Sequence, residues 1–233
     1  MKIIINGLGR IGKLVFRRLC DENLHENIAL VNEKAGSTSD QEYFLRYDTV
    51  HGTWGDDLCF KNGCLNYKDH SIDVMTEGSI ENISFPKSEK FLVVDCTGVN
   101  KSEKLLEPYF KKKASYVLIS APIESSGVQN IVYGINHQSI DTSAYKIFTA
   151  ASCTTNCLAP IVKVLEENIG IEHGSITTIH NITNSQTIVD APKNNLRRSR
   201  SGINSLIPTT TGSARAISLI YPELKGRLNG HAV

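Results

Sequence analysis

The sequence contains no apolar run that approaches the roughly 20 residues needed to cross a bilayer. It also lacks a basic, then apolar, then small-residue segment at its start, which is the pattern of a secretory signal. The apolar stretch 2–6 has only the length of a strand. These absences favour a cytoplasmic protein with no membrane partner, in which six cysteines are expected to be free thiols.

An excess of charge of one sign is missing as well. Lys and Arg number 25 against 24 Asp and Glu, which gives a formal net charge of +1. This balance argues against a nucleic-acid partner, because such binding depends on a basic surface. With 233 residues and no internal repeat or low-complexity linker, the chain is expected to form one large or two modest domains.

A glycine cluster follows the first apolar stretch. Gly7, Gly9 and Gly12 fit the pattern G-x-G-x-x-G between a strand and an amphipathic segment. Glycine permits the tight turn, the close approach of a pyrophosphate and the packing of helix on strand, and the helix N-terminus offers N–H groups to phosphates. A glycine turn without a ligand is the alternative. The expected apolar helix face is Ile11, Leu14, Val15 and Leu19, with Lys13, Arg17 and Arg18 opposite.

Further strands are predicted over 28–33, 91–98 and 115–122, with a helix over 102–113. The first of these ends in Glu33, 21 residues after Gly12, where an acid accepts the ribose hydroxyls of NAD and disfavours a 2′-phosphate. The other two end near Thr97-Gly98 and Ser120-Ala121, at the sheet edge where ligands bind.

Between these units, residues 59–67 read as a hairpin around Asn62-Gly63, and 70–78 as one more strand. Cys59, Cys64 and Cys96 lie in apolar patterns and are expected to be core thiols.

Residues 152–157, "SCTTNC", hold two cysteines four positions apart at the start of a predicted helix that stops at Gly170. A metal site would need two further ligands at a recognisable spacing, and a disulfide within one helical turn is awkward. A thiol at a helix N-terminus has a lowered pKa, so Cys153 is the candidate nucleophile. Cys157 lies one turn inside and is expected to be a buried, inert thiol.

Residues 174–184 alternate like a strand and carry His180, which can pair with a thiolate and shuttle its proton. A polar loop follows, and then a Thr-Gly turn opens a helix within 207–221. Thr211 and Gly212, with Arg198 near them, would form an anion site. The spacing leaves open whether these groups converge, and purely structural roles for the cysteine and the histidine are the alternative.

The combination "NGLGRIG", "ASCTTNCLAP", "TTIHNIT", "LRRSR" and "PTTTGSARA" resembles the phosphorylating glyceraldehyde-3-phosphate dehydrogenase family, in the family's order and from residue 2 to the last residue. The resemblance implies an α/β fold, in which an N-terminal Rossmann-type doubly wound parallel sheet is followed by part of a second α+β catalytic domain with a mixed sheet. It implies an NAD-binding domain over 1–150 and a catalytic domain over 151–233.

The implied reaction is NAD-dependent oxidation of glyceraldehyde 3-phosphate, with inorganic phosphate, to 1,3-bisphosphoglycerate through a Cys153 thioester, with His180 as the base and no metal. The implied NAD-binding residues are Asn6, Gly7, Gly9, Arg10, Ile11, Gly12, Glu33, Thr97, Gly98 and Ser120. The implied phosphate-binding residues are Ser152, Thr154, Thr183, Arg198, Thr211 and Gly212. The family also implies a homotetramer with the loop 190–205 near a neighbouring subunit.

The sequence departs from the family at two places. Position 33 is Glu where most members have Asp, and "HNITNSQTIVDAP", "SLIPTTTGSA" and "IYPELKGRLNGHAV" look closest to an arsenic-resistance-associated branch, in which arsenate is the acyl acceptor. Relatives that act on erythrose 4-phosphate are an alternative. The sequence stops at Val233, where members continue with Arg-Val-Pro, so we expect a fragment with reduced or no activity. A non-catalytic NAD-binding fragment is the competing interpretation.

Overall fold

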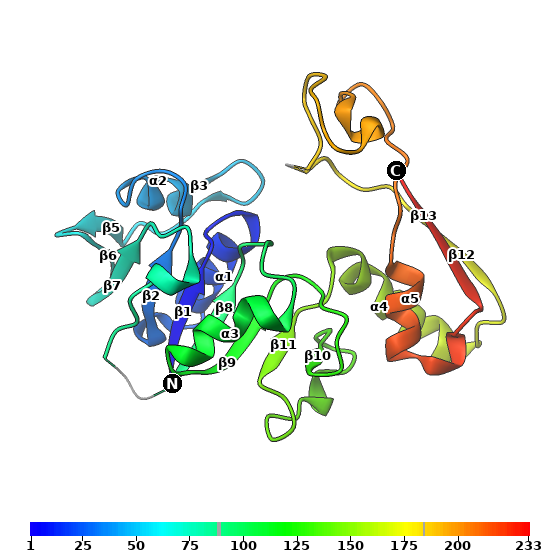
Figure 1. The fold of residues 1–233 in the computed structure, drawn as a ribbon, viewed down its shortest axis with the longest axis horizontal. Helices are drawn as coiled ribbons and strands as arrows, with labels where there is room; N and C mark the ends of the chain where they lie inside the picture. Colours follow the sequence, from blue (N-terminus) through cyan, green and yellow to red (C-terminus); the bar gives the residue numbers. More distant parts are fainter. Residues whose placement is uncertain (88–89, 184) are drawn as a thin grey trace. The chain divides into compact units, whose positions relative to one another are not determined.

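The structure is a computed structural model, and it describes residues 1–87, 90–183 and 185–233 (Figure 1). The chain divides into two compact units. The first comprises Met1–Ile131 with Ser139–Ser152, and the second comprises Val132–Gln138 with Cys153–Val233. No helix within the described ranges has both the length and the apolar character needed to cross a membrane.

Within the described residues, a nine-stranded sheet forms the centre of the first unit, in the order β10-β11-β9-β8-β1-β2-β7-β6-β5. The strands from β10 to β7 pair in parallel, and β6 and β5 continue the sheet antiparallel. Their bounds are β1 Lys2–Asn6, β2 Ile28–Asn32, β5 Leu58–Lys61, β6 Cys64–Tyr67, β7 His70–Met75, β8 Phe91–Asp95, β9 Ala114–Ile119, β10 Val128–Asn130 and β11 Ile147–Thr149. A separate antiparallel ribbon consists of β3 Tyr47–Asp48 and β4 Gly52–Thr53.

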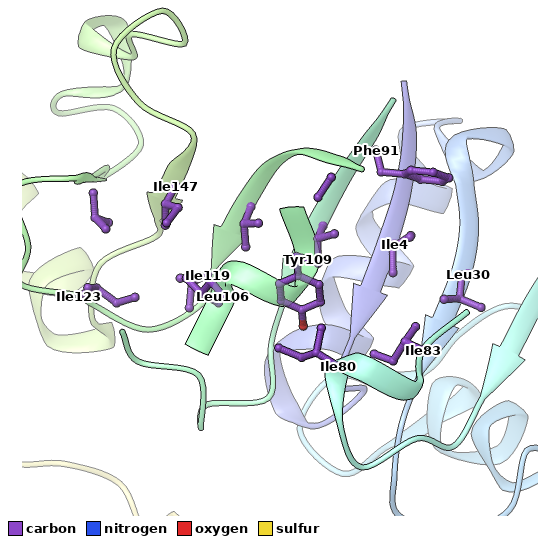
Figure 2. Packing of buried hydrophobic residues seen from close by; sticks show 14 residues of the cluster. Ile4, Leu30, Ile80, Ile83, Phe91, Leu106, Tyr109, Ile119, Ile123 and Ile147 are labelled. Atoms are coloured by element: carbon purple, nitrogen blue, oxygen red, sulfur yellow. The ribbon is translucent and has the colours of Figure 1, made fainter. Parts of the chain in front are cut away.

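Helices cover both faces of this sheet, because the side chains of a strand alternate between its faces. On one face Ile4 of β1 belongs to a buried cluster with Leu106 and Tyr109 of α3 (Glu103–Lys111), as Figure 2 shows. On the other face Ile3 and Ile5 belong to a cluster that includes residues of α1 (Arg10–Asp21) and α2 (Asp40–Arg46). The sheet is therefore doubly wound, and the predicted fold class is confirmed.

The predicted strands and the hairpin are confirmed within one to three residues at their ends. Asn62 has φ 55° and Gly63 has φ 81°, which are the two left-handed residues of a tight hairpin turn. The expectation that Cys59 is a core thiol is wrong, because β5 is the edge strand and Cys59 alternates with the buried Leu58. Cys64 and Cys96 are half-buried.

The buried face of α1 differs in part from the predicted one, of which Val15 and Leu19 are partly buried and pack against the core. Gly12, Phe16 and Cys20, one turn apart, face the sheet, whereas Ile11 is 50% exposed. A Cβ atom on Gly12 would lie 1.8 Å from the carbonyl oxygen of Gly7, so this turn of the helix lies against the glycine loop. The close contact at Gly12 sets the rotation of the helix, and the residues at i+4 and i+8 follow it into the core.

Arg17 was expected on the solvent side of α1 and is buried. Its guanidinium donates to the carbonyl oxygens of Leu45 at 2.8 Å and Gly52 at 3.3 Å, and lies 5.8 Å from the centre of the Trp54 ring. The expectation fails because two backbone acceptors and an aromatic face replace water around the charge.

The second unit contains α4 (Cys153–Asn168), α5 (Ser213–Ile220) and the parallel pair β12 (Gly174–Thr178) and β13 (Leu228–Ala232). An antiparallel bridge between Thr209 and Ala232 makes the pairing mixed, as predicted. α4 stops where predicted, since Gly170 has φ 73° and donates its N–H to Leu165 O at 3.0 Å. The strand predicted over 174–184 ends earlier, at Thr178.

The 3-10 helices in the described residues of both units are η1 His25–Asn27, η2 Ile80–Asn82, η3 His137–Ser139, η4 Leu196–Ser199 and η5 Pro222–Leu224.

Substituting the third glycine of the loop tests its close packing. Gly12→Ala is expected to lower the free energy of unfolding by about 1–3 kcal/mol, because its methyl group collides with the backbone of Gly7. Urea denaturation followed by circular dichroism measures the change. Gly9→Ala is the matched control, since a Cβ there has nothing within 4 Å, and should change stability by less than about 0.5 kcal/mol. Equal losses in the two variants would contradict the packing argument.

Candidate active site

A pocket of about 290 Å³ opens in the first unit beside the glycine loop. It is lined by five of the predicted NAD-binding residues, which are Asn6, Gly7, Gly9, Glu33 and Thr97. These residues lie at or just after the carboxyl ends of β1, β2 and β8, which are neighbours in the sheet. This is the edge at which doubly wound sheets bind their ligands.

The glycine loop packs directly against the backbone of Cys96 and Thr97, and this close packing leaves room for a ligand beside it. Gly7 has φ 91°, and a Cβ atom there would lie 2.8 Å from the carbonyl carbon of Cys96 and from the nitrogen of Thr97. The Gly7 N–H donates to Asn32 O at 2.7 Å, which fixes the turn. Helix α1 begins directly after this loop. Its N-cap residue is Gly9, so no side chain of that residue accepts a hydrogen bond from the first N–H groups of the helix. The loop therefore offers open backbone donors to a phosphate.

Glu33 is held in place at the edge of this pocket. One carboxylate oxygen accepts the N–H of Leu8 at 2.7 Å, and the other accepts the N–H of Ala35 at 2.9 Å. Each oxygen can accept another hydrogen bond, so the fixed carboxylate can receive the hydroxyls of a ribose. The residues present fit NAD.

The other predicted NAD-binding residues are not part of the pocket lining. They are Arg10, Ile11, Gly12, Gly98 and Ser120. The Arg10 side chain forms an ion pair with the Asp48 carboxylate. Lys13 Nζ also pairs with it, at 2.5 Å from Asp48 Oδ2. The hydrogen bond from Lys13, with backbone N–H groups and Arg10, holds the pKa of Asp48 far below its usual range.

Sequence reasoning missed much of the lining. The missed residues are Asn32, Lys34, Glu77, Gly78, Ser79, Ile80, Glu81, Cys96, Val99, Asn100 and Leu105. The segment 77–81 follows β7, whose strand was predicted, but its approach to the glycine loop depends on β7 pairing with β2. The available signal was the rule that loops after parallel strands meet at one edge.

The predicted nucleophile and base come together in the second unit. Cys153 Sγ lies 3.3 Å from His180 Nε2, and Thr154 Oγ1 lies 4.0 Å from the same sulfur. His180 Nδ1 lies 2.7 Å from the carbonyl oxygen of Asn181. Because a carbonyl oxygen only accepts, Nδ1 carries the ring proton and Nε2 faces the thiol with its lone pair. The imidazole is oriented to take the thiol proton.

The environment favours a charged form of this pair. Partial burial raises the pKa of Cys153, but hydrogen bonds from His180 and Thr154 and the charge of His180 lower it below its ordinary value. The backbone carbonyl of Asn181 and the Cys153 thiolate raise the pKa of His180. These shifts favour transfer of the proton from sulfur to nitrogen, which produces a nucleophilic thiolate.

Cys157 is exposed, so the expectation of a buried thiol is wrong. The buried residues of α4 are Thr155, Ala159 and Val162, which recur at helical spacing on one face. Cys157 lies two residues after Thr155 and therefore about 200° around the helix from it. Among the described residues, no group of three or more His, Cys, Asp or Glu is arranged to hold a metal ion.

The predicted phosphate-binding residues come from several segments of the chain. Arg198, in η4, donates to Thr209 Oγ1 at 2.9 Å, two residues before Thr211. Thr211 Oγ1 accepts the N–H of Ser213 at 3.2 Å, and Gly212 is the N-cap of α5. Arg198 and the Thr-Gly turn thus lie in one neighbourhood.

The remaining three phosphate candidates lie elsewhere in the chain. Thr183 Oγ1 hydrogen-bonds the side chains of Gln186 at 2.8 Å and Ser185 at 2.9 Å. Ser152 is half-buried directly before Cys153, and Thr154 follows it. Ser185 lines a pocket together with Arg198, so the contact of Thr183 with Ser185 connects Thr183 to the neighbourhood of Arg198.

A doubly wound sheet with a glycine-loop pocket, followed by a unit that carries a paired thiol and imidazole, defines a two-part α/β nucleotide-binding enzyme. Residues 1–103 match the family model "Glyceraldehyde 3-phosphate dehydrogenase, NAD binding domain". Residues 152–233 match the model "Glyceraldehyde 3-phosphate dehydrogenase, C-terminal domain". NAD is the cofactor of the first of these domains.

Curated relatives resemble the whole chain. It is 42% identical over 233 residues to glyceraldehyde-3-phosphate dehydrogenase 3 of Nostoc sp., covering all of this chain and 68% of the relative. It is 39% identical over 233 residues to the Geobacillus stearothermophilus glyceraldehyde-3-phosphate dehydrogenase, covering all of this chain and 69% of that relative. The chain belongs to the glyceraldehyde-3-phosphate dehydrogenase family, a family of NAD-dependent oxidoreductases, and spans about two thirds of the length of these relatives.

The thiol–imidazole pair can be tested by alkylation with iodoacetamide across a range of pH. The rate at Cys153 should stay high to lower pH than at an ordinary thiol, because its lowered pKa preserves the thiolate. His180→Asn should raise this pKa and slow labelling at pH 7 by about tenfold for each unit of increase. Peptide mass spectrometry separates Cys153 from Cys157.

The control is Asn181→Ala, which keeps the carbonyl that orients His180 because that carbonyl belongs to the backbone. This variant should leave the labelling profile of Cys153 near that of the unchanged chain. A profile that His180→Asn does not move would contradict the pairing.

Proposed function

We propose that the chain carries the site for NAD-dependent, phosphorylating oxidation of glyceraldehyde 3-phosphate to 1,3-bisphosphoglycerate. The observation that carries this proposal is the distance of 3.3 Å between Cys153 Sγ and His180 Nε2, with the imidazole oriented by the Asn181 carbonyl. The names of the relatives and of the two family models support the same activity.

The residues of this chain have a defined chemical sequence in the proposal. Cys153 thiolate attacks the aldehyde carbon, and the proton that His180 took from the thiol passes from Nε2 to the new alkoxide, which gives a hemithioacetal. His180 Nε2 then accepts the hydroxyl proton of the hemithioacetal as the hydride leaves its carbon, and the thioester forms. Bound NAD supplies the hydride acceptor. The oxygen of an inorganic phosphate then attacks the Cys153 thioester, the carbon–sulfur bond breaks, and the thiolate returns. The thioester conserves the energy of the oxidation until the acyl group reaches phosphate.

We propose Ser152, Thr154, Thr183, Arg198, Thr211 and Gly212 as ligands of the substrate and acceptor phosphates. The clearest support concerns Arg198, whose guanidinium reaches Thr209 beside the Thr-Gly turn. A guanidinium offers several donors in one plane, and the first N–H groups of α5 lie after Gly212. Together they suit a tetrahedral dianion.

The acyl acceptor in this proposal is phosphate or arsenate, which have nearly the same shape and charge. The sequence likeness to the arsenic-resistance-associated branch supports arsenate, and erythrose 4-phosphate remains an alternative substrate. We also propose an NAD-binding domain over 1–150 and a catalytic domain over 151–233. A cytoplasmic homotetramer, with the loop 190–205 near a neighbouring subunit, completes the proposal.

The central test is production of NADH by the 233-residue chain from glyceraldehyde 3-phosphate, with phosphate and arsenate compared. Cys153→Ser should abolish turnover, because the hydroxyl is a far weaker nucleophile than the thiolate. His180→Asn should lower kcat by about 10²–10⁴-fold through loss of the base. Cys157→Ser, four residues away and exposed, is the matched control and should retain activity.

Calorimetry with NAD separates the two interpretations of the chain. Binding of NAD together with turnover that needs Cys153 supports the enzyme. Binding without turnover supports the non-catalytic NAD-binding module. Turnover that survives Cys153→Ser would overturn the proposed mechanism.

A further inference from the structure

A chain of buried and partly buried hydrogen bonds crosses the carboxyl ends of four neighbouring strands at the pocket. At one end Asn32, the last residue of β2, exchanges two hydrogen bonds with the backbone of Glu77, at 2.8 and 2.9 Å. Asn32 Nδ2 also donates to Asn6 Oδ1 at 2.7 Å, at the end of β1. Asn6 Nδ2 in turn donates to the hydroxyl of Tyr109 at 2.5 Å, and that hydroxyl donates to Asp95 Oδ2 at 2.8 Å.

The chain of hydrogen bonds ends on a fully buried carboxylate. Asp95, the last residue of β8, is 0% exposed. Its Oδ1 accepts the N–H of Thr97 at 2.9 Å and the Thr97 hydroxyl at 2.7 Å, and its Oδ2 accepts Asn100 Nδ2 at 2.7 Å. With Tyr109, these donors offset the cost of removing the carboxylate from water. Asp95 therefore fixes the loop that carries Thr97 and Asn100, both of which line the pocket.

Tyr109 joins the two halves of this network from outside the pocket. It is 0% exposed, and its ring packs in the core with Leu106 and Ile80 (Figure 2). Burial, together with the charge of Asp95, raises the pKa of the Tyr109 phenol well above its usual range, so the hydroxyl keeps its proton. The hydroxyl can therefore accept from Asn6 and donate to Asp95 at the same time.

We propose that Tyr109 is a positioning residue for the dinucleotide pocket, although it does not line it. Its hydroxyl links Asn6, on the glycine-loop side, to Asp95, which holds the loop of Thr97 and Asn100 on the other side. The inference rests on the proposed function, because it takes NAD as the ligand. A binding site whose walls are held before the ligand arrives spends less of its binding energy on ordering them.

Removal of the hydroxyl leaves two buried groups short of a partner. In Tyr109→Phe the ring still fills the core, but Asn6 Nδ2 and Asp95 Oδ2 each lose one hydrogen bond. The hydroxyl then no longer joins Asn6 on one side of the pocket to Asp95 on the other. We expect the dissociation constants of NAD and of ADP-ribose to rise together by about tenfold.

The experiment is calorimetry of the 233-residue chain and its variants with NAD and with ADP-ribose. Leu106→Val, in the same helix and core cluster, is the matched control, because it loosens packing without touching the hydrogen-bond chain. It should leave both dissociation constants within about twofold of the unchanged chain. Asp95→Asn is a second variant. It replaces one accepting oxygen of Asp95 by an NH₂ group, which faces groups that also donate. It should weaken binding at least as much as Tyr109→Phe.

Hydrogen exchange of the ligand-free chain supplies a second readout. The backbone N–H groups of residues 96–101 should exchange faster in Tyr109→Phe and not in Leu106→Val. Unchanged affinity and unchanged exchange in Tyr109→Phe, with NAD bound by the unchanged chain, would overturn this inference alone. An unchanged chain that binds neither NAD nor ADP-ribose would overturn the proposed cofactor and this inference with it.

Discussion

The parallel pairing of β1 with both β2 and β8 is the constraint on which the first unit depends. In this register Asn6 lies opposite Asn32 on one side and opposite Asp95 on the other, so the three strands end level with one another. Alternation along β1 sends Ile4 to one core and Ile5 to the other, which obliges helices to cover both faces. The polar last residues cannot enter either apolar core, and they bond to one another at the edge where the pocket opens.

The second unit uses a helix start and a strand end in the same way. Cys153 is the first residue of α4 and lies two residues after Ala151, whose φ of 56° is unusual for a residue with a side chain. His180 lies two residues beyond β12, and its N–H donates to the carbonyl oxygen of Val233 at 2.9 Å. Val233, the residue after β13, therefore holds the backbone of His180, while the imidazole ring makes the contact with Cys153. The nucleophile and base come from elements that are both anchored by backbone hydrogen bonds.

Local sequence signals predicted the helices and strands well. Contacts between residues far apart in the sequence determined the features that these signals could not predict. The glycine pattern predicted the loop and helix α1, because its requirements are met within one strand–helix unit. The same pattern could not reveal that Arg17 is buried, since its acceptors belong to the distant residues Leu45 and Gly52. The pairing of Cys153 with His180 followed from family resemblance, and neither residue's spacing alone could place them 3.3 Å apart. The sequence pattern does not distinguish Tyr109, because a tyrosine in an apolar helix pattern is typical of an ordinary core residue.

Three cysteines of this chain show why one of them is chemically different. Burial raises the pKa of Cys20 to about 12, with the nearby charge of Asp21 adding to the effect, and burial raises that of Cys96 to about 11. Removal from water, with a carboxylate nearby, therefore makes these two thiols inert at neutral pH. At Cys153 the same desolvation is present but smaller effects from His180 and Thr154 together exceed it, and the pKa falls. The reactivity of Cys153 thus depends on a balance between desolvation, which raises its pKa, and its partners, which lower it. A more enclosed sulfur would need a stronger partner than one imidazole. A more exposed sulfur would be less closely held against its base.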